Sequence, residues 1–355
     1  MARIERLCVA GFEDVVFCRD EQSGLHAIIA IHDTSLGPAV GGTRMLPYDS
    51  EEQALADVLR LSRAMTYKAA AAGLNFGGGK SVIIGHPKRD KTENLLLAFG
   101  RFVDALDGRF ITGEDVGTSA DDMRIAARET SHAIFPQREL DPDWETAAIT
   151  ARGVLRGILA CAHEALGADC LSGLKVALQG VGKVGARLSR MLYAEGVRLT
   201  VCDVEYERAA AVASELDAVL VEPQEIFSSS TDVICPCALG GVLDDKVISS
   251  LHCRIVAGAA NNQLAEERHD RALWERGILY APDYVINAGG LISALYEMGS
   301  WDRDRVIART DAVYDRLLGV FASARAKNVS TQAAADRFVE ERLRRSRQQR
   351  GLTAR

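Results

Sequence analysis

The segment at residues 174–203 constrains the fold more than any other part of the chain. An apolar run, LKVALQG, leads directly into Gly180-Val181-Gly182-Lys183-Val184-Gly185 and then into a helix-like stretch, ARLSRMLYAEG. A second apolar run, VRLTVCD, ends at Asp203. Glycines at this spacing allow a tight turn and let a pyrophosphate approach the backbone at a helix N-terminus. The context therefore predicts a Rossmann dinucleotide-binding unit.

Asp203 stands where such units carry the acid that bonds the ribose hydroxyls. A carboxylate there repels a 2′-phosphate, so the sequence favours NAD over NADP. Two later segments, 232–241 (DVICPCALGG) and 254–264 (RIVAGAANNQL), are typical of strands that end in small-residue loops. Asn261 and Asn262 could bond a carboxamide or a ribose, although asparagines in a turn are equally ordinary. A Rossmann-like turn without a ligand is the alternative.

Strand-like and helix-like segments alternate along almost all of the 355 residues, which predicts an α/β fold with parallel sheets. We expect two domains with a cleft between them: an α/β substrate and catalytic domain over 1–150 and a doubly wound Rossmann NAD-binding domain over 151–330. A last helical segment is predicted over about 302–347, and a C-terminal helix, 331–355, is expected to pack back on the first domain. We interpret its arginine-rich end, RLRRSRQQR, as a solvated helix end or frayed tail.

Composition excludes several classes of protein. The net charge of −7 argues against non-specific binding to nucleic acid or to an anionic membrane. No apolar run is long enough to span a bilayer, and the N-terminus lacks a signal-peptide core. Eight cysteines without a paired framework indicate a reducing cytoplasm. Cys235-Pro236-Cys237 lacks the spacing of a metal or redox site, so no metal is expected.

A glycine-rich stretch, GLNFGGGKSVIIGHP, covers residues 73–87 and ends its glycine run at Lys80. It is not a phosphate-binding loop, because that motif needs a glycine where this chain has Leu74. A helix should also follow, whereas the run at 81–84 is typical of a strand. Lys80 is therefore expected between a flexible loop and a buried strand, held in a cleft.

Two further charged residues are predicted at element ends. A helix that starts at Ser50 carries Val58, Leu61 and Met65 on its apolar face, and Lys68 is next on that face. Asp115 follows the strand-like run RFIT, at the end where open α/β sheets bind ligands.

Lys68, Lys80 and Asp115 together fit the oxidation of an amino acid to a keto acid. Two lysines near one cleft lower each other's pKa, so one can bind an anion while the other acts as a base. A nearby carboxylate can exchange a proton with an amine. A 2-hydroxy acid dehydrogenase would need a His/Asp relay, and the adjacent pair His32-Asp33 has no supporting pattern. Spacing alone does not show that the three residues meet.

The sequence resembles the glutamate/leucine/phenylalanine/valine dehydrogenases, on the leucine/phenylalanine/valine branch, over about residues 15–345. The resemblance rests on LGPAVGGTRMLPY, LSRAMTYKAAAAGLNFGGGKSVIIGHP, GRFITGEDVGT, the Rossmann turn, CPCALGG, AGAANNQL and YAPDYVINAGG. Two positions depart from the family pattern, His86 before a proline and Arg152 where an aromatic residue is common.

The resemblance implies a reversible, NAD-dependent oxidative deamination of an L-amino acid to a 2-oxo acid and ammonia by a homo-oligomer. Lys80 would activate the water that attacks the imine carbon, and Asp115 would pass a proton to and from the amino group. The implied substrate-binding residues are Lys68, Gly41, Gly42, Met65, Gly113, Thr150 and Leu291. The implied cofactor-binding residues are Gly180, Gly182, Lys183, Val184, Gly185, Asp203, Cys237, Ala238, Ala259, Asn261, Asn262 and Asn287.

The resemblance also bears on the substrate. Phenylalanine-type members tend to carry Gly and Leu at the positions of Gly113 and Leu291, as here, whereas leucine- and valine-type members tend to carry Ala and Val. We therefore expect L-phenylalanine. The alternatives are leucine or valine, with Gly113 only a turn glycine, or tryptophan, although members of that type tend to have Ala at Gly42. A non-catalytic NAD-binding paralogue is a further alternative, which the presence of all three charged residues disfavours.

Overall fold

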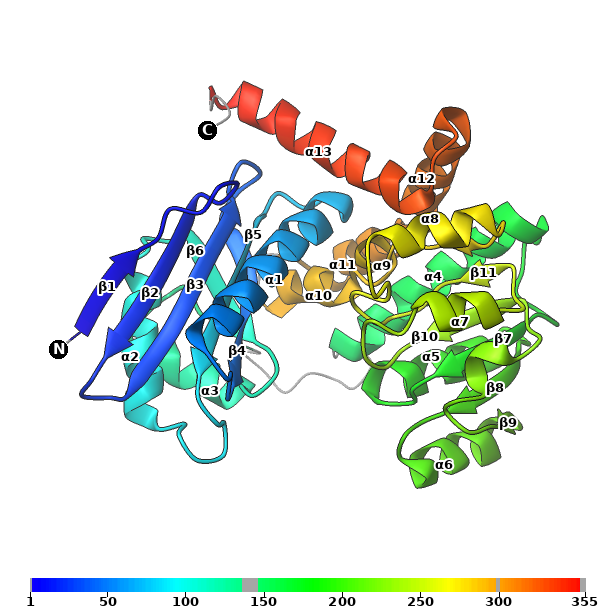
Figure 1. Cartoon of the computed structure of the whole chain (residues 1–355), viewed down its shortest axis with the longest axis horizontal. Helices are drawn as coiled ribbons and strands as arrows, with labels where there is room; N and C mark the ends of the chain where they lie inside the picture. The colour runs from blue at the N-terminus through cyan, green and yellow to red at the C-terminus, as the bar shows by residue number, and fades with distance from the viewer. Residues whose placement is uncertain (1, 136–145, 298–300, 352–355) are drawn as a thin grey trace. The chain divides into compact units, whose positions relative to one another are not determined.

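A computed structural model describes residues 2–135, 146–297 and 301–351 of the chain (Figure 1). These residues divide into two compact units. The first contains the described parts of Met1–Glu139, Glu297–Ser300 and Val339–Arg355, and the second those of Leu140–Tyr296 and Trp301–Phe338. Each unit is built on its own six-stranded sheet, so the expected α/β class is confirmed.

The sheet of the first unit has the strand order β1-β2-β3-β5-β4-β6. Its strands are β1 Ala2–Arg6, β2 Asp14–Asp20, β3 Leu25–Asp33, β4 Ala39–Leu46, β5 Gly77–Ile84 and β6 Phe110–Glu114, and its helices are α1 Glu51–Ala71, α2 Glu93–Asp104 and α3 Ala120–Ala126. Strands β5, β4 and β6 are mutually parallel, whereas β1, β2, β3 and β5 pair in antiparallel fashion. The carboxyl ends of β5, β4 and β6 therefore meet at one edge of the sheet.

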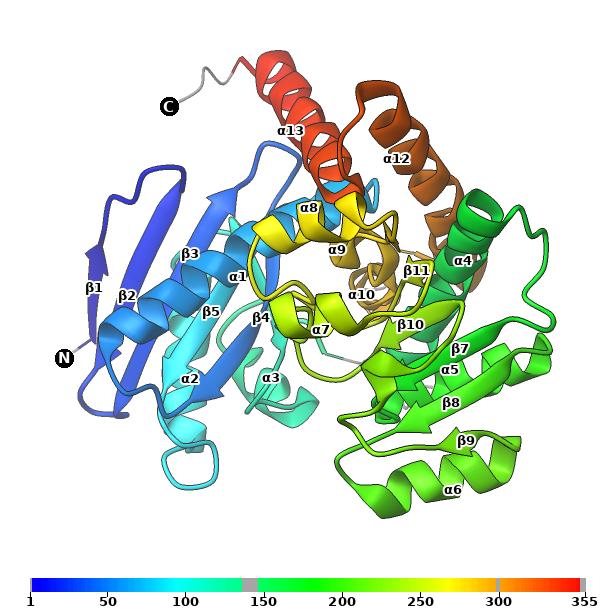
Figure 2. The same ribbon diagram turned by 45° about the vertical axis from the view of Figure 1, so that its right-hand side comes forward.

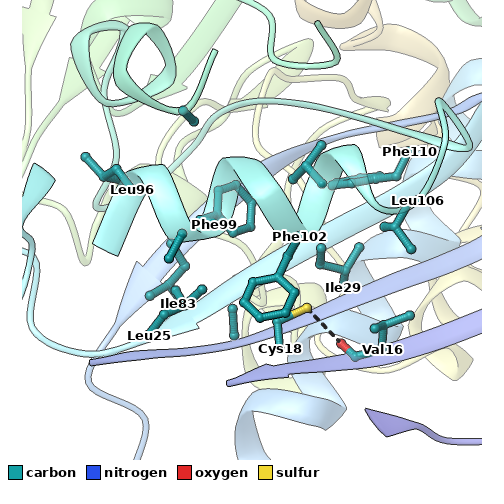
Figure 3. Packing of buried hydrophobic residues seen from close by; sticks show 14 of the residues in the cluster. Val16, Cys18, Leu25, Ile29, Ile83, Leu96, Phe99, Phe102, Leu106 and Phe110 are labelled. Atoms are coloured by element: carbon teal, nitrogen blue, oxygen red, sulfur yellow. Dashed lines mark hydrogen bonds between the residues drawn. The ribbon is translucent and has the colours of Figure 1, made fainter. Parts of the chain in front are cut away.

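Apolar side chains cover both faces of this sheet. Phe99 and Phe102 of α2 pack on one face against residues such as Ile29 (Figure 3). Val58 of α1 packs on the other face, in the same cluster as Ile28, which precedes Ile29 in β3. Successive strand residues point to opposite faces, so a strand buried between two helices is apolar on both sides. The side of the sheet covered by α1 is the α1 face (Figure 2).

Helix α1 begins as the sequence predicts. The side chain of Ser50 accepts a hydrogen bond from the Gln53 N–H at 3.2 Å, and Glu51 lies in the first turn, where it interacts favourably with the helix dipole. Val58 is fully buried, whereas Lys68 is only half-buried.

The glycine-rich stretch differs from its prediction. Gly77, Gly78 and Gly79 belong to β5 rather than to a flexible loop, so Lys80 lies inside the strand. A Cβ at Gly77 would lie 2.0 Å from the Asp33 carbonyl oxygen, and one at Gly78 would lie 2.0 Å from the Thr66 backbone nitrogen. The glycines are needed because neighbouring segments of the same chain pack directly on this backbone, and not because the stretch must be mobile.

The sheet of the second unit has the order β12-β11-β10-β7-β8-β9, and all its strand pairs are parallel (Figure 2). The strands are β7 Lys175–Gln179, β8 Arg198–Cys202, β9 Val219–Leu220, β10 Val233–Pro236, β11 Ile255–Val256 and β12 Leu279–Tyr280. The helices are α4 Thr146–Leu166, α5 Lys183–Ala194, α6 Tyr206–Leu216, α7 Asp245–Ser250, α8 Arg268–Glu275, α9 Asp283–Ile286 and α10 Gly289–Glu297. The chain adds strands on one side of β7 and then on the other, and this parallel strand order is that of a Rossmann sheet, as predicted. Residues 146–150 form the first turn of α4.

The C-terminal segment, predicted as one helical stretch, contains α11 Arg303–Asp311, α12 Val313–Lys327 and α13 Thr331–Gln349. Asn328 ends α12 in the left-handed conformation, with φ at 51°. No helix in the parts of the chain that the structure describes is long and apolar enough to cross a membrane.

The interpretation of the arginine-rich end as solvated is wrong for two of its arginines. In the first unit, the Arg342 guanidinium donates to the carbonyl oxygen of Leu74 at 2.8 Å and to that of Ala70, at the C-terminus of α1. Arg347 forms an ion pair with buried Asp33. Arg345, by contrast, is exposed. Helical spacing explains the difference, since only one side of α13 contacts the first unit.

Candidate active site

Lys80 and Asp115 meet on the α1 face of the first sheet. Lys80 projects from β5 with only 7% of its surface exposed, and its Nζ forms an ion pair with Asp115 Oδ2 just beyond β6. Strand β4 lies between β5 and β6 and places Gly42 beside the pair. A Cβ at Gly42 would lie 2.9 Å from Asp115 Cβ and 3.2 Å from Lys80 Nζ. Residue 42 therefore has no room for a side chain, because the ion pair packs directly against the β4 backbone.

The surroundings shift both pKa values of the pair. Burial lowers the pKa of Lys80 below 10.5; the charge of Asp115 opposes this, and the charge of Arg44 adds to it. Burial alone would raise the pKa of Asp115, but the charges of Lys80 and Arg44 outweigh it, and the net effect is a pKa below 3.8. Lys80 therefore loses its proton more readily than a free lysine does, while Asp115 stays ionised.

A cation that the sequence does not point to contributes to this shift. The sequence predicts Lys68 as the neighbouring cation, and the structure adds Arg44 among the principal causes. Arg44 lies two residues after Gly42, so both project onto the α1 face of β4. The alternation of residues along the strand could have pointed to Arg44 from the sequence. The sequence does not show the strand register that brings β4 beside Lys80.

A tight turn fixes the backbone of Asp115. Its N–H donates to Thr118 Oγ1 at 3.0 Å, and Thr118 Oγ1 donates to the Thr43 carbonyl oxygen at 2.7 Å. Gly117 in this turn has φ at +81°, and a Cβ there would lie 2.0 Å from the Met45 carbonyl oxygen. The turn is thereby attached to β4, and the carboxylate of Asp115 is directed toward Lys80.

The remaining candidates for the substrate site lie in both units. In the first, a Cβ at Gly41 would lie 1.8 Å from the Gly79 carbonyl oxygen, so β4 and β5 approach closely there. Met65 and Lys68 are half-buried in the last turns of α1, which packs along β5. In the second, Thr150 of α4 and Leu291 of α10 are both buried.

Gly113 differs from the other glycines of the site. It lies within β6 opposite Gly42 of β4, so it also faces the α1 side. Its φ is not in the left-handed region, and an added Cβ would meet nothing closer than Ile134, at 3.9 Å. The interpretation of Gly113 as a turn glycine is therefore not needed, because neither backbone nor packing requires a glycine at this position.

The glycine fingerprint of the second unit forms a turn that is tight on one side and open on the other. Gly180 has φ at +93°, and a Cβ at Gly185 would lie 1.9 Å from the Gly180 carbonyl oxygen. At Gly182, which caps α5, a Cβ would meet nothing within 4 Å. Lys183 and Val184 open the helix. This arrangement fits a pyrophosphate, which needs free N–H groups and close backbone approach.

Asp203 stabilises the same turn. Its carboxylate accepts hydrogen bonds from the N–H of Val181 at 2.8 Å and of Glu205 at 3.0 Å, and Arg208 lies 3.6 Å from it. The Asp203 side chain is only 7% exposed. It therefore joins the glycine turn to the end of β8, in the position from which a ribose would be bound.

The loops after β10 and β11 hold the other cofactor candidates. Cys237 and Ala238 follow β10, and Ala238 lies against the fingerprint, 2.7 Å from where a Cβ of Gly180 would be. Asn287 Nδ2 donates to Asn261 Oδ1 at 2.8 Å and to the Ala259 carbonyl oxygen at 3.2 Å. Asn262 is exposed, with φ at 50°.

The cysteines and the two atypical positions have ordinary surroundings. Cys235 and Cys237 are free thiols with their Sγ atoms 3.6 Å apart. Among the described residues, no cluster of His, Cys, Asp and Glu could hold a metal ion. His86 accepts a hydrogen bond from the Lys88 N–H at 3.1 Å, and Arg152 forms a two-point ion pair with Asp311 at 2.7 Å.

Comparisons with known proteins point to one family. The family model described as "Glu/Leu/Phe/Val dehydrogenase, dimerisation domain" matches residues 12–132, and "Glutamate/Leucine/Phenylalanine/Valine dehydrogenase" matches 200–351. Leucine dehydrogenase of Geobacillus stearothermophilus is 50% identical over 94% of this chain and 90% of its own length. Phenylalanine dehydrogenase of Caldalkalibacillus thermarum is 47% identical over 94% and 92%.

A solved structure is similarly close. The crystal structure of L-tryptophan dehydrogenase from Nostoc punctiforme matches with a TM-score of 0.85 and 48% identity, over 95% of this chain and 97% of that one. Fold, site and relatives together define an oxidoreductase that acts on the CH–NH2 group of amino acids. The chain belongs to the Glu/Leu/Phe/Val dehydrogenase family.

Proposed function

We propose that this amino acid dehydrogenase uses NAD to deaminate L-phenylalanine oxidatively and reversibly. The reaction converts the amino acid, NAD⁺ and water into the 2-oxo acid, ammonium, NADH and a proton. The observation that carries the proposal is the buried Lys80–Asp115 ion pair, which packs directly against Gly42. A buried amine with a lowered pKa beside a carboxylate supplies a base and a proton carrier in one place.

The first unit would carry the acid–base steps. Lys80, once neutral, takes a proton from the water that attacks the imine carbon. Asp115 carries a proton to and from the substrate amino group. Lys68 would bind the substrate carboxylate, together with the backbone N–H groups near Gly41 and Gly42. These roles need a fixed carboxylate, which the turn at Asp115–Thr118 supplies.

The second unit would hold NAD. Bound NAD would supply the acceptor for the hydride of the substrate Cα. The open turn at Gly182 suits the pyrophosphate, and Asp203 suits the ribose hydroxyls because a 2′-phosphate would be repelled. Asn261 is held by Asn287, which orients its amide group near the end of β11.

The substrate preference rests on Gly113 and Leu291. Space for a methyl group exists at Gly113 and is left empty, although nothing in the backbone prevents a larger residue. An unfilled position beside Asp115 gives room for a flat ring. At residue 42, the alanine that tryptophan-type members tend to carry would bring its Cβ to 2.6 Å from the Glu114 carbonyl oxygen. That contact weighs against tryptophan.

Leucine is the second candidate, because several relatives of about half identity are named leucine dehydrogenase. We also infer a homo-oligomer, since the family model that matches residues 12–132 is described as a dimerisation domain. Neither inference changes the acid–base assignment.

One experiment tests the reaction and the substrate together. Purified protein is mixed with NAD⁺ and, separately, with L-phenylalanine, L-tryptophan, L-leucine or L-valine, and NADH absorbance is followed. The proposal expects the highest kcat/KM with phenylalanine. If leucine gave the highest kcat/KM, the proposed chemistry would stand and the preferred substrate would be leucine. No turnover of any L-amino acid would favour a non-catalytic NAD-binding protein.

A further inference from the structure

Arg44 connects the Lys80–Asp115 pair to helix α1. Its Nε lies 3.5 Å from Asp115 Oδ2, and both atoms are buried. Its Nη1 donates to Asp57 Oδ2 at 3.0 Å, on the second turn of α1. One guanidinium therefore contacts two carboxylates, and one of them is the proposed proton carrier. The planar fork of an arginine suits such a two-point contact better than a lysine does.

Asp57 is held in turn by two other groups. Tyr48 donates its hydroxyl to Asp57 Oδ2 at 2.8 Å, and Arg60 donates to Asp57 Oδ1 at 2.7 Å. Asp57 thus accepts three hydrogen bonds, and its side chain is only 16% exposed. A carboxylate with so many partners cannot swing away without losing them, so it fixes the end of Arg44.

We propose that Arg44, anchored by Asp57, is a positioning residue for the reaction: it holds the Asp115 carboxylate toward Lys80 and supplies the second positive charge of the site. This inference rests on the proposed function. Without Arg44, Asp115 Oδ2 would have Lys80 as its cationic partner alone among the described contacts. The carboxylate would then lose its second contact and could rotate away from the position in which it faces Lys80.

The pair consists of Lys80 on β5 and Asp115 after β6. Among the contacts that the structure describes, Arg44 on β4 and Asp57 on α1 bring further charges to it, with the Tyr48 hydroxyl behind Asp57. Arg44 lowers the pKa of both Lys80 and Asp115, whereas Asp57 raises that of Lys80. Removal of the Arg44 charge should therefore raise the pH at which Lys80 becomes neutral.

The test compares Arg44→Met with Arg60→Met. Both variants remove a guanidinium that contacts Asp57, but Arg60 does not contact Asp115 and is 53% exposed. For oxidative deamination, we expect Arg44→Met to lower kcat and to move the rising limb of the pH profile upward by about one pH unit. Arg60→Met should leave that limb in place, and Arg44→Lys should restore its position without restoring kcat in full.

A second readout needs no substrate. The pH dependence of Lys80 acetylation by acetic anhydride, followed by peptide mass spectrometry, reports when the amine becomes neutral. It should shift upward in Arg44→Met and remain unchanged in Arg60→Met, with melting curves to show that each variant is folded. If the enzyme turned over no amino acid, the proposed function would fail while this shift could still be measured.

Two results would overturn the inference. One is a loss of rate in Arg44→Met with both pH dependences unmoved, which would make Arg44 a purely structural contact between β4 and α1. The other is an equal shift in Arg60→Met, which would make the effect one of overall charge. If Arg44→Met did not fold, Asp57→Asn would replace it. That variant keeps the guanidinium but removes its charged anchor, and an unchanged kcat would sink the proposal.

Discussion

Gly42 and Gly113 lie opposite each other on neighbouring parallel strands, yet only one of them has room for a side chain. A Cβ at Gly42 would lie 2.6 Å from the Glu114 carbonyl oxygen, whereas one at Gly113 would meet nothing closer than 3.9 Å. The two positions thus separate two functions of a glycine. Gly42 lets the reacting groups pack directly against β4, and Gly113 leaves part of the proposed side-chain pocket empty.

Gly113→Ala should fold normally and change substrate preference. The added methyl group makes ordinary van der Waals contact with Ile134 and occupies space that a phenyl ring would use. One methyl group in a pocket discriminates by about ten-fold or somewhat more. We expect the ratio of kcat/KM for L-phenylalanine to that for L-leucine to fall by about that factor. An unchanged ratio would place the side-chain pocket elsewhere.

Lys80→Ala should remove most of the turnover and leave NADH binding intact. Loss of a general base typically costs about 10²–10⁴ in rate. Lys80 belongs to the first unit and the glycine fingerprint to the second, so NADH fluorescence titration should give an unchanged Kd. Lys88→Ala, at an exposed lysine in the turn after β5, is the control for charge. Near-normal turnover in Lys80→Ala would exclude Lys80 from the mechanism.

The pH profile of the unmodified enzyme should reflect the lowered pKa of Lys80. Only the neutral amine can act as the base, so deamination should accelerate as the pH rises through that pKa, below the ordinary value of 10.5. Reductive amination needs the protonated amine, so its rate should fall over the same interval. Initial rates in both directions across a pH series test this. An inflection at or above 10.5 would contradict a buried, activated lysine.

The sequence predicts the positions of these groups better than their contacts. The sequence indicates Lys80 because it ends a glycine run before a strand-like segment, and Asp115 because it follows such a segment at the end where open α/β sheets bind ligands. Arg44 was missed, because its role depends on β4 lying between β5 and β6, and no local pattern encodes that order. The glycines before Lys80 predict a loop, since close packing of a neighbouring backbone and flexibility leave the same glycine signature.

Asp203→Ala should reduce the preference for NAD over NADP. The substitution removes the carboxylate that repels a 2′-phosphate and leaves Arg208, now 3.6 Å from that carboxylate, to attract one. It also removes two hydrogen bonds that hold the glycine turn, so KM for NAD should rise. Glu207→Ala, an exposed acid nearby with the same change in charge, is the control. An equal NAD/NADP ratio in wild type and Asp203→Ala would mean that another group recognises the ribose.

Arg342→Ala should destabilise the protein, although it lies in a stretch that reads as a solvated tail. Arg342 donates to the Ala70 carbonyl oxygen in the last turn of α1 and to the Leu74 carbonyl oxygen just beyond it. Loss of charged hydrogen bonds to such groups costs about 1–3 kcal/mol of the free energy of unfolding. Arg345→Ala on the exposed side of α13 removes the same charge and a surface ion pair with Glu341, so it should change stability little. Urea unfolding of the two variants measures the difference in the free energy of unfolding. Equal values would mean that Arg342 behaves as a solvated arginine.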